Sequence, residues 1–122
     1  MLSEGLVRFI RAHLGSVWAL EVMLRMSAAP ARDWAVDVLV RELRASDPLV
    51  AGVLDQFQRS GLTTKNADGT WRWQPATPEL KRAADGLLEA HAVTPVAVIQ
   101  AIVDAPRGRL SDFADAFRLR KD

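Results

Sequence analysis

The sequence contains no cysteine among its 122 residues. This absence excludes disulfide bonds, thiolate metal sites and cysteine nucleophiles, and it fits an intracellular compartment. Long apolar runs are missing as well, because no stretch approaches the roughly 20 residues that a membrane-spanning helix needs. The N-terminal stretch MLSEGLVRF carries Glu4 where a secretory signal would have a basic start followed by an apolar block. We therefore expect a cytoplasmic protein without a membrane span.

The charge of the chain is nearly balanced, with 16 basic and 15 acidic residues and a pI near 8.3. A strongly basic nucleic-acid-binding protein would carry a larger excess of lysine and arginine. Hydrophobic residues make up 49% of the chain and charged residues 25%, as in an ordinary globular domain. Because this length suits one domain, we expect a single domain over 1–106 followed by a tail over 107–122.

Signatures of catalysis and metal binding are also missing. The sequence shows no glycine-rich phosphate loop, no paired catalytic carboxylates and no triad pattern. Ser16 and Ser111 lie at the starts of predicted helices, where capping explains them. His13 and His91 fall on apolar stripes of different predicted helices, with no second imidazole or carboxylate at ligand spacing. We interpret both as structural histidines and expect a protein that is not an enzyme and has no cofactor.

Apolar residues at helical spacing predict four helices in the first half of the chain. We expect Gly15 to be a left-handed cap of the first helix, Ser16 to cap the second, and Pro30 to stop it. The third helix is DWAVDVLVRELRAS, and the fourth is expected to have Asp47 as its cap and Gly61 as its end. The inward stripes are Leu6, Phe9 and Ile10; Leu20, Met23 and Leu24; Val36, Leu39, Val40 and Leu43; and Val50, Val53, Leu54 and Phe57.

Residues 62–74 depart from helical spacing. LTTK and TWRWQ alternate apolar and polar side chains around NADG, whose composition favours a tight turn, so we predict one β-hairpin. Trp71 and Trp73 fall on the same face of its second strand. Stacking on a ligand or partner would explain the pair, but aromatic residues on a hairpin usually cover the core, and we favour that interpretation.

Two further helices follow, each opened by a Thr-Pro pair, at Thr77 and at Thr94. The second is apolar nearly all round, so we expect it to be buried on more than one side, in part by a second copy of the chain. The N-terminal stripe would supply the other half of such a dimer interface. The apolar residues of this second helix are Val96, Val98, Ile99, Ile102 and Val103.

The tail ends with LSDFADAFRLRKD, in which Phe113 and Phe117 are four residues apart. That spacing would place both on one side of a short amphipathic helix. Two roles remain open for the tail. It would either fold back over the helix that follows Thr94 and make the monomer self-sufficient, or hold a protein partner through Phe113 and Phe117.

Residues 16–74 follow the order of a winged helix-turn-helix, with a helix, a tight turn, a second helix and then a hairpin. They resemble the winged-helix domains of small bacterial transcription regulators of the MarR-like kind, and QRSGLTTKNADGTWRWQ resembles the passage from recognition helix into wing. The resemblance covers about half the chain. It implies a mainly α fold with one β-hairpin wing and flanking N- and C-terminal helices, a homodimer, and double-stranded DNA as partner.

On this resemblance, the helix that begins at Pro48 enters the major groove. Gln56 and Arg59 would face outward there, with hydrogen-bonding geometry suited to adenine and guanine. Asp55 opposes this role, because its carboxylate would approach phosphates unless it pairs with Arg59 at i+4. A solvated helix face explains the same residues without DNA. The phosphate contacts would come from Arg41, Arg44, Lys65 and Arg72.

A winged-helix module that binds protein and not DNA is the alternative function. The nearly neutral charge, the acid in the recognition helix and the aromatic tail favour it, and the fold alone serves both functions. The surface that carries Arg41, Arg44, Arg59, Lys65 and Arg72 distinguishes the two. A continuous positive surface favours DNA, whereas a mixed or apolar surface favours protein.

Overall fold

Helix α1 opens the described part of the chain, which is residues 2–104 of the computed structural model, and spans Glu4–His13. The Ser3 side chain caps it by accepting a hydrogen bond from the Leu6 amide at 3.3 Å. Phe9 and Ile10 are buried in the core of the same chain. The expectation that this stripe forms half of a dimer interface is therefore wrong.

Helix α2 spans Val17–Ser27, and the predicted cap is confirmed, because Ser16 accepts a hydrogen bond from the Ala19 amide at 3.2 Å. The left-handed cap predicted at Gly15 is wrong. Helix α1 ends on Leu14 with φ −111°, and Gly15 does not have a positive φ. The chain passes from one helix to the next through the extended Ser16, so no left-handed turn is needed.

Strand β1, Asp33–Trp34, stands where the sequence predicted the start of the third helix. Its two residues pair antiparallel with strand β3, and Ala35 stays extended before helix α3 begins at Val36 and runs to Leu43. The predicted helix is therefore confirmed from Val36 onward only. The two preceding residues belong to the sheet because Trp34 is buried there.

Helix α4 spans Asp47–Ser60. Its cap is Ser46, which accepts a hydrogen bond from the Leu49 amide at 3.3 Å, and the prediction of Asp47 as the cap is wrong. Pro48, expected at the first helical position, lies at the second, and it has no amide hydrogen to offer. The helix is therefore capped one residue earlier than the sequence predicted.

Gly61 ends α4 with φ +87°, as predicted, and turns the chain into the hairpin. Strands β2, Thr63–Lys65, and β3, Trp71–Trp73, pair antiparallel. Strand β1 lies on the other side of β3, so the sheet order is β1-β3-β2. The predicted hairpin is confirmed, but it belongs to a three-stranded sheet.

Both tryptophans of β3 are buried, which confirms that they cover the core. Trp73 meets Phe57 of α4 edge to face, with ring centroids 6.2 Å apart and planes inclined by 77°. The buried hydroxyl of Thr63 donates a hydrogen bond to the Leu54 carbonyl at 3.4 Å. The sheet is thus fixed to the inner face of α4, and the outer face of that helix is left uncovered.

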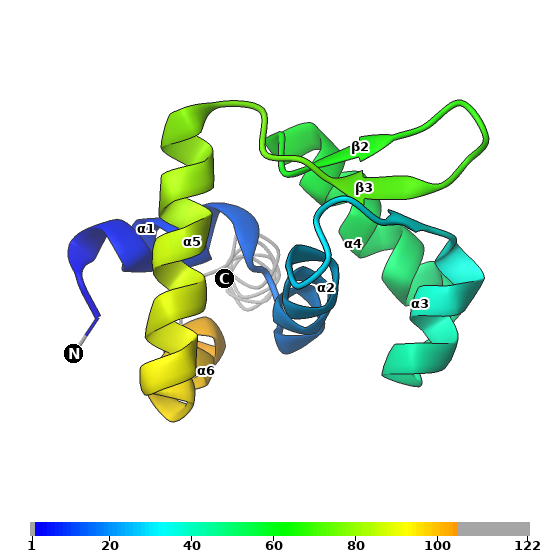
Figure 1. The fold of residues 1–122 in the computed structure, drawn as a ribbon. Helices are drawn as coiled ribbons and strands as arrows, with labels where there is room; N and C mark the ends of the chain where they lie inside the picture. Colours follow the sequence, from blue (N-terminus) through cyan, green and yellow to red (C-terminus); the bar gives the residue numbers. More distant parts are fainter. Residues whose placement is uncertain (1, 105–122) are drawn as a thin grey trace, which may run out of the picture.

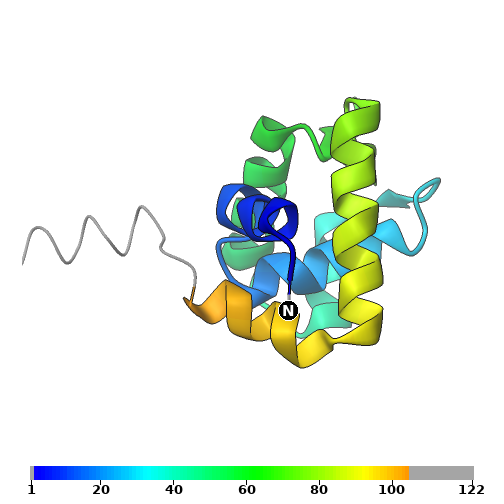
Figure 2. The same ribbon diagram turned by 90° about the vertical axis from the view of Figure 1, so that its left-hand side faces the viewer.

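Helices α5, Pro78–Val93, and α6, Pro95–Asp104, complete the described chain. Thr77 caps α5 as predicted, accepting a hydrogen bond from the Leu80 amide at 3.1 Å. Figure 2 shows α6 running across the base of α5. Among the described residues no single helix is long and apolar enough to span a membrane, and only the α5–α6 pair, bent by 118°, reaches that length and composition together.

The described part of the chain buries helix α6 on one side only, so burial of its other side by a second copy stays a prediction. Val98 and Ile102 are buried, whereas Val96 is 77% exposed and Val103 is 55% exposed. The buried pair packs where α6 contacts α1, α2 and α5. The described helices cover one face of α6 and leave the opposite face to solvent.

The elements combine into a mainly α fold with a helix–turn–helix and a β-hairpin wing. Figure 1 shows α3 and α4 on one side with the hairpin above them, and α5 upright on the other side next to α1. Helix α2 lies between the two groups and contacts both α4 and α6. The predicted fold class, with helices flanking the wing unit at both ends, is confirmed.

His13 gives the fold a pH-dependent element. Its ring lies 4.7 Å from that of Phe9, and its Nδ1 is buried without a partner among the described residues. Burial lowers the pKa of His13. As the pH falls below about 6.5, His13 binds a proton in the unfolded chain before it does so in the folded chain. The free energy of unfolding should therefore decrease. Urea unfolding across this range should show a smaller loss for His13→Gln than for the wild type. Equal losses would contradict this prediction.

Candidate interaction surfaces

The outward face of α4 is exposed along its length, as the sequence predicted. Gln56 and Arg59 lie on it, one turn apart, while Val53, Leu54 and Phe57 face the core. The other exposed residues of this face include Ala51, Gly52, Asp55 and Gln58. The surface thus has few charged groups, and the charges that it has are of both signs.

Arg59 is paired within its own helix. Its Nη1 lies 3.4 Å from Oδ2 of Asp55, one helical turn earlier, and both side chains are exposed. Such an exposed pair contributes little to stability, but it places a carboxylate next to the guanidinium. A phosphate or base edge that approached Arg59 would also approach Asp55.

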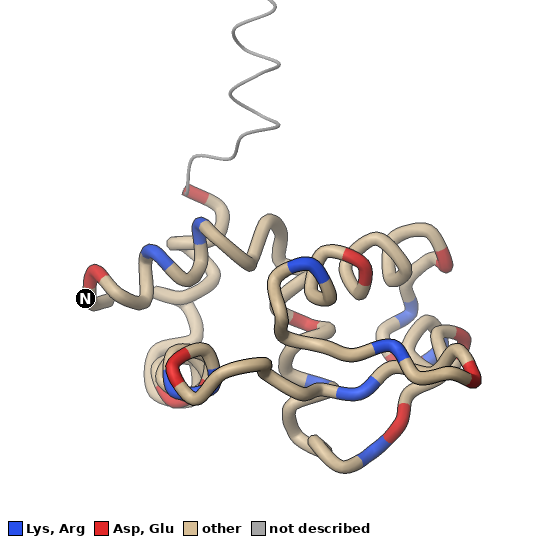
Figure 3. Tube along the Cα trace, turned by 90° about the horizontal axis from the view of Figure 1, so that it is seen from above, with Lys and Arg blue, Asp and Glu red and all other residues tan. Residues whose placement is uncertain are grey.

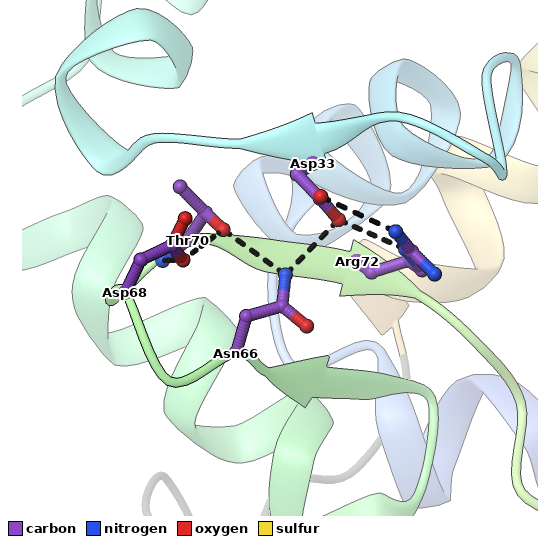
Figure 4. A network of polar contacts seen from close by, with 5 residues as sticks. All are labelled: Asp33, Asn66, Asp68, Thr70 and Arg72. Atoms are coloured by element: carbon purple, nitrogen blue, oxygen red, sulfur yellow. Dashed lines mark hydrogen bonds and ion pairs between the residues drawn. The ribbon is translucent and has the colours of Figure 1, made fainter.

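Arg72 is held more firmly, by the strand that the sequence did not predict. Its Nε and Nη2 donate to Oδ1 and Oδ2 of Asp33 at 2.8 and 3.2 Å, a two-point contact across β3 and β1. Asn66 donates to the same carboxylate at 3.0 Å. Figure 4 shows Asp33 between Arg72 and Asn66. Arg72 is therefore engaged within the sheet.

The tip of the wing carries a negative charge. Thr70 donates to Oδ1 of Asp68 from its hydroxyl at 2.6 Å and from its amide at 3.0 Å. These hydrogen bonds, the hydroxyl one first, hold the pKa of Asp68 below its usual value, so the side chain is ionised at neutral pH. Gly69, with φ +90°, allows the tight turn that brings the two residues together.

Arg41, Arg44 and Lys65 are exposed, and within the described part of the chain no carboxylate lies at ion-pair distance from them. Arg41 and Arg44 end α3, where Arg44 adopts the left-handed conformation with φ 55°. Lys65 lies over the ring of Trp71, 5.5 Å from its centroid. These three cations remain available to a partner, but they are divided between the end of α3 and the wing.

The net charge of residues 33–74, which we term the wing unit, is slightly negative. Five basic residues, Arg41, Arg44, Arg59, Lys65 and Arg72, stand against six acidic ones, Asp33, Asp37, Glu42, Asp47, Asp55 and Asp68. Figure 3 shows Lys and Arg interspersed with Asp and Glu along this part of the trace. Charges of both signs are therefore interspersed along the wing unit, and the basic residues do not form an uninterrupted run.

An apolar surface lies on the opposite side of the fold from the wing, at the base of α5. It consists of Val96, Ile99 and Val103 on α6, with the 80% exposed Val93 at the end of α5, and we term it the α6 face. The three α6 residues follow the spacing i, i+3, i+7, which aligns them on one stripe. The sequence showed these residues to be apolar but not which of them are exposed.

A groove of about 700 Å³ lies between the α1–α2 junction and one flank of α4. Sequence reasoning missed it. Trp18 borders the groove and is 39% exposed, whereas the other three tryptophans are buried. A signal was present, because Trp18 lies off the inward stripe of α2 that Leu20 and Met23 define. Besides Trp18, this Trp18 groove is lined by Arg11, Gly15, Leu49, Gly52 and Gln56.

The histidines and the two phenylalanines of the tail are the remaining residues that the sequence singled out. In the described chain no group of three or more histidine, aspartate or glutamate side chains is arranged to hold a metal ion. His13 and His91 lie on α1 and α5. Phe113 and Phe117, expected to bind a partner, lie outside the described residues.

Comparisons with protein-family models, curated proteins and solved structures found no match to this chain. The function is therefore inferred from the charges, exposed surfaces and contacts of the chain itself.

Proposed function

We propose that this protein is a winged-helix module that binds protein and not DNA. The observation that carries the proposal is the charge balance of the surface formed by α4 and the wing. Asp55 accompanies Arg59, and Asp33 holds Arg72 in a two-point contact. Two of the six residues expected to contact DNA therefore have carboxylates as neighbours.

Duplex DNA binds proteins mainly through its phosphates, so a binding surface gains affinity from each cation it can bring to them. Here an approaching phosphate would also meet the ionised Asp68 at the wing tip and Asp55 on α4. A protein partner faces no such requirement, since mixed charges at the edge of an interface suit complementary pairing. The charge pattern thus supports a protein surface.

A second copy of this chain is the partner that we propose for the α6 face. Val96, Ile99 and Val103 form one apolar stripe, and exposed apolar patches on proteins commonly mark interfaces. Asp104 is the only charged residue of α6. In an antiparallel twofold pair the two Asp104 side chains would lie at opposite ends, so the stripe can meet its own copy without repulsion.

Replacing Val96 by lysine tests this dimer. Sedimentation equilibrium of the full chain should show a dimer for the wild type and a monomer for Val96→Lys, because a charge would be buried in the apolar contact. Gln58→Lys is the control, since it adds the same charge at an exposed polar position on α4, away from the α6 face. A wild type that stays monomeric at every concentration, or a Val96→Lys variant that dimerises equally well, would contradict the proposal.

A DNA-binding regulator is the second candidate, and the arrangement of elements favours it. The turn between α3 and α4 followed by the wing leaves the outward face of α4 open, as major-groove recognition requires. For such a protein, Arg59→Ala should weaken specific binding by about 1–3 kcal/mol. Lys65→Ala and Arg72→Ala should weaken binding to all sequences alike and flatten its salt dependence. Unchanged affinity of these variants for any duplex would exclude this candidate.

A further inference from the structure

The Trp18 groove has a bare backbone on both of its walls. A Cβ added at Gly15 or at Gly52 would meet no atom within 4 Å. Gly52 lies in the interior of α4, where glycine costs about 1 kcal/mol relative to alanine. No described neighbour requires a glycine at either position, so the space they leave suits a side chain that arrives from elsewhere.

The chemistry of the groove defines what would bind there. Trp18 offers an exposed aromatic surface, and Leu49 adds a half-buried aliphatic side chain. Arg11 lines the groove as well, and no carboxylate among the described residues lies at ion-pair distance from it. An aromatic segment with acidic residues therefore matches the apolar lining of the groove and its positive charge.

The chain itself contains such a segment. The stretch LSDFADAF, residues 110–117, combines Phe113 and Phe117 with Asp112 and Asp115 and has no basic residue. The α6 face is a poorer match for it, because that face offers no cation and its helix ends in Asp104. Asp112 and Asp115 would find no basic partner there, whereas Arg11 attracts them at the groove.

The described chain ends close to the helices that form the groove. Helix α6 packs against α1 and α2, which supply Arg11 and Trp18, and Figure 2 shows its end below α1. Six residue steps separate Asp104 from Leu110. An extended chain covers about 20 Å in six steps, which is more than the roughly 15 Å length of a ten-residue helix such as α1.

We propose that residues 110–117 of the C-terminal segment bind in the Trp18 groove of their own chain. Phe113 and Phe117 would contact Trp18 in the space left by the two glycines, and Asp112 and Asp115 would approach Arg11. Gln56 lines the same groove, so the bound segment would cover one flank of the α4 surface. This inference rests neither on the α6 dimer nor on the choice between protein and DNA as partner.

Acrylamide quenching of tryptophan fluorescence in the full chain tests the proposal. Trp34, Trp71 and Trp73 are buried, so accessible emission reports on Trp18. We expect weak quenching in the wild type and stronger quenching when Phe113→Ser and Phe117→Ser are combined. Arg118→Ser with Arg120→Ser is the control, because it changes the same tail outside residues 110–117.

Exchanging the charges of the groove and the tail distinguishes the loss of this contact from misfolding. Arg11→Asp alone, and Asp112→Arg with Asp115→Arg, should each increase quenching, whereas the combined exchange should restore protection. Quenching that is equal in all variants would overturn the proposal. So would protection in the wild type that disappears on dilution, since that result would assign the groove to the tail of a second copy.

Discussion

Replacing Phe57 by alanine is expected to lower the free energy of unfolding by about 3–5 kcal/mol, as truncation of a buried aromatic residue does. The Phe57 side chain is fully buried between α4 and the wing and contacts Trp73 edge to face. Its loss would leave a cavity where α4 meets the sheet. Urea unfolding monitored by circular dichroism measures the change.

Gln58→Ala is the matched control for Phe57, because the neighbouring side chain is exposed on the same helix. Its effect should lie within about 0.5 kcal/mol of zero. If Phe57→Ala cost no more than this control, the inward stripe of α4 would have been assigned to the wrong face.

Replacing Trp34 by alanine should be as costly, about 3–5 kcal/mol. Trp34 is 2% exposed on β1, and the guanidinium of Arg32 lies 3.7 Å from its ring centroid. Its Nε1 is buried without a partner among the described residues. Trp34→Phe should therefore cost much less, because it keeps a ring in the core and removes an unpaired N–H. A near-neutral Trp34→Ala would contradict the burial of this side chain beside the sheet.

Features that depend on neighbouring residues could be predicted from the sequence, whereas features that depend on contacts between distant residues could not. The hairpin was predictable because NADG and the flanking alternation are local signals, and Gly61 marked the end of α4 for the same reason. Strand β1 was not, because two residues show no periodicity and their partners on β3 lie 39 and 37 positions later. The contact between Arg72 and Asp33 depends on that pairing, so it was missed as well.

Other errors came from competition between neighbouring residues or elements. Ser46 and Asp47 are both good caps, and the local sequence does not decide between them. The apolar composition of α6 was plain from the sequence, but which face it buries depends on the crossing of α5 and α6. The Trp18 groove requires α1, α2 and α4 to meet, and no local pattern encodes that arrangement.

A titration of the full chain against duplex DNA across a range of salt concentrations tests the central claim most directly. The claim is that paired and opposing carboxylates prevent the surface of α4 and the wing from acting as a DNA-binding surface. We predict no saturable binding even at low salt. Saturable binding whose affinity falls steeply with salt, with a slope matching several phosphate contacts, would contradict the claim and establish the DNA-binding function instead.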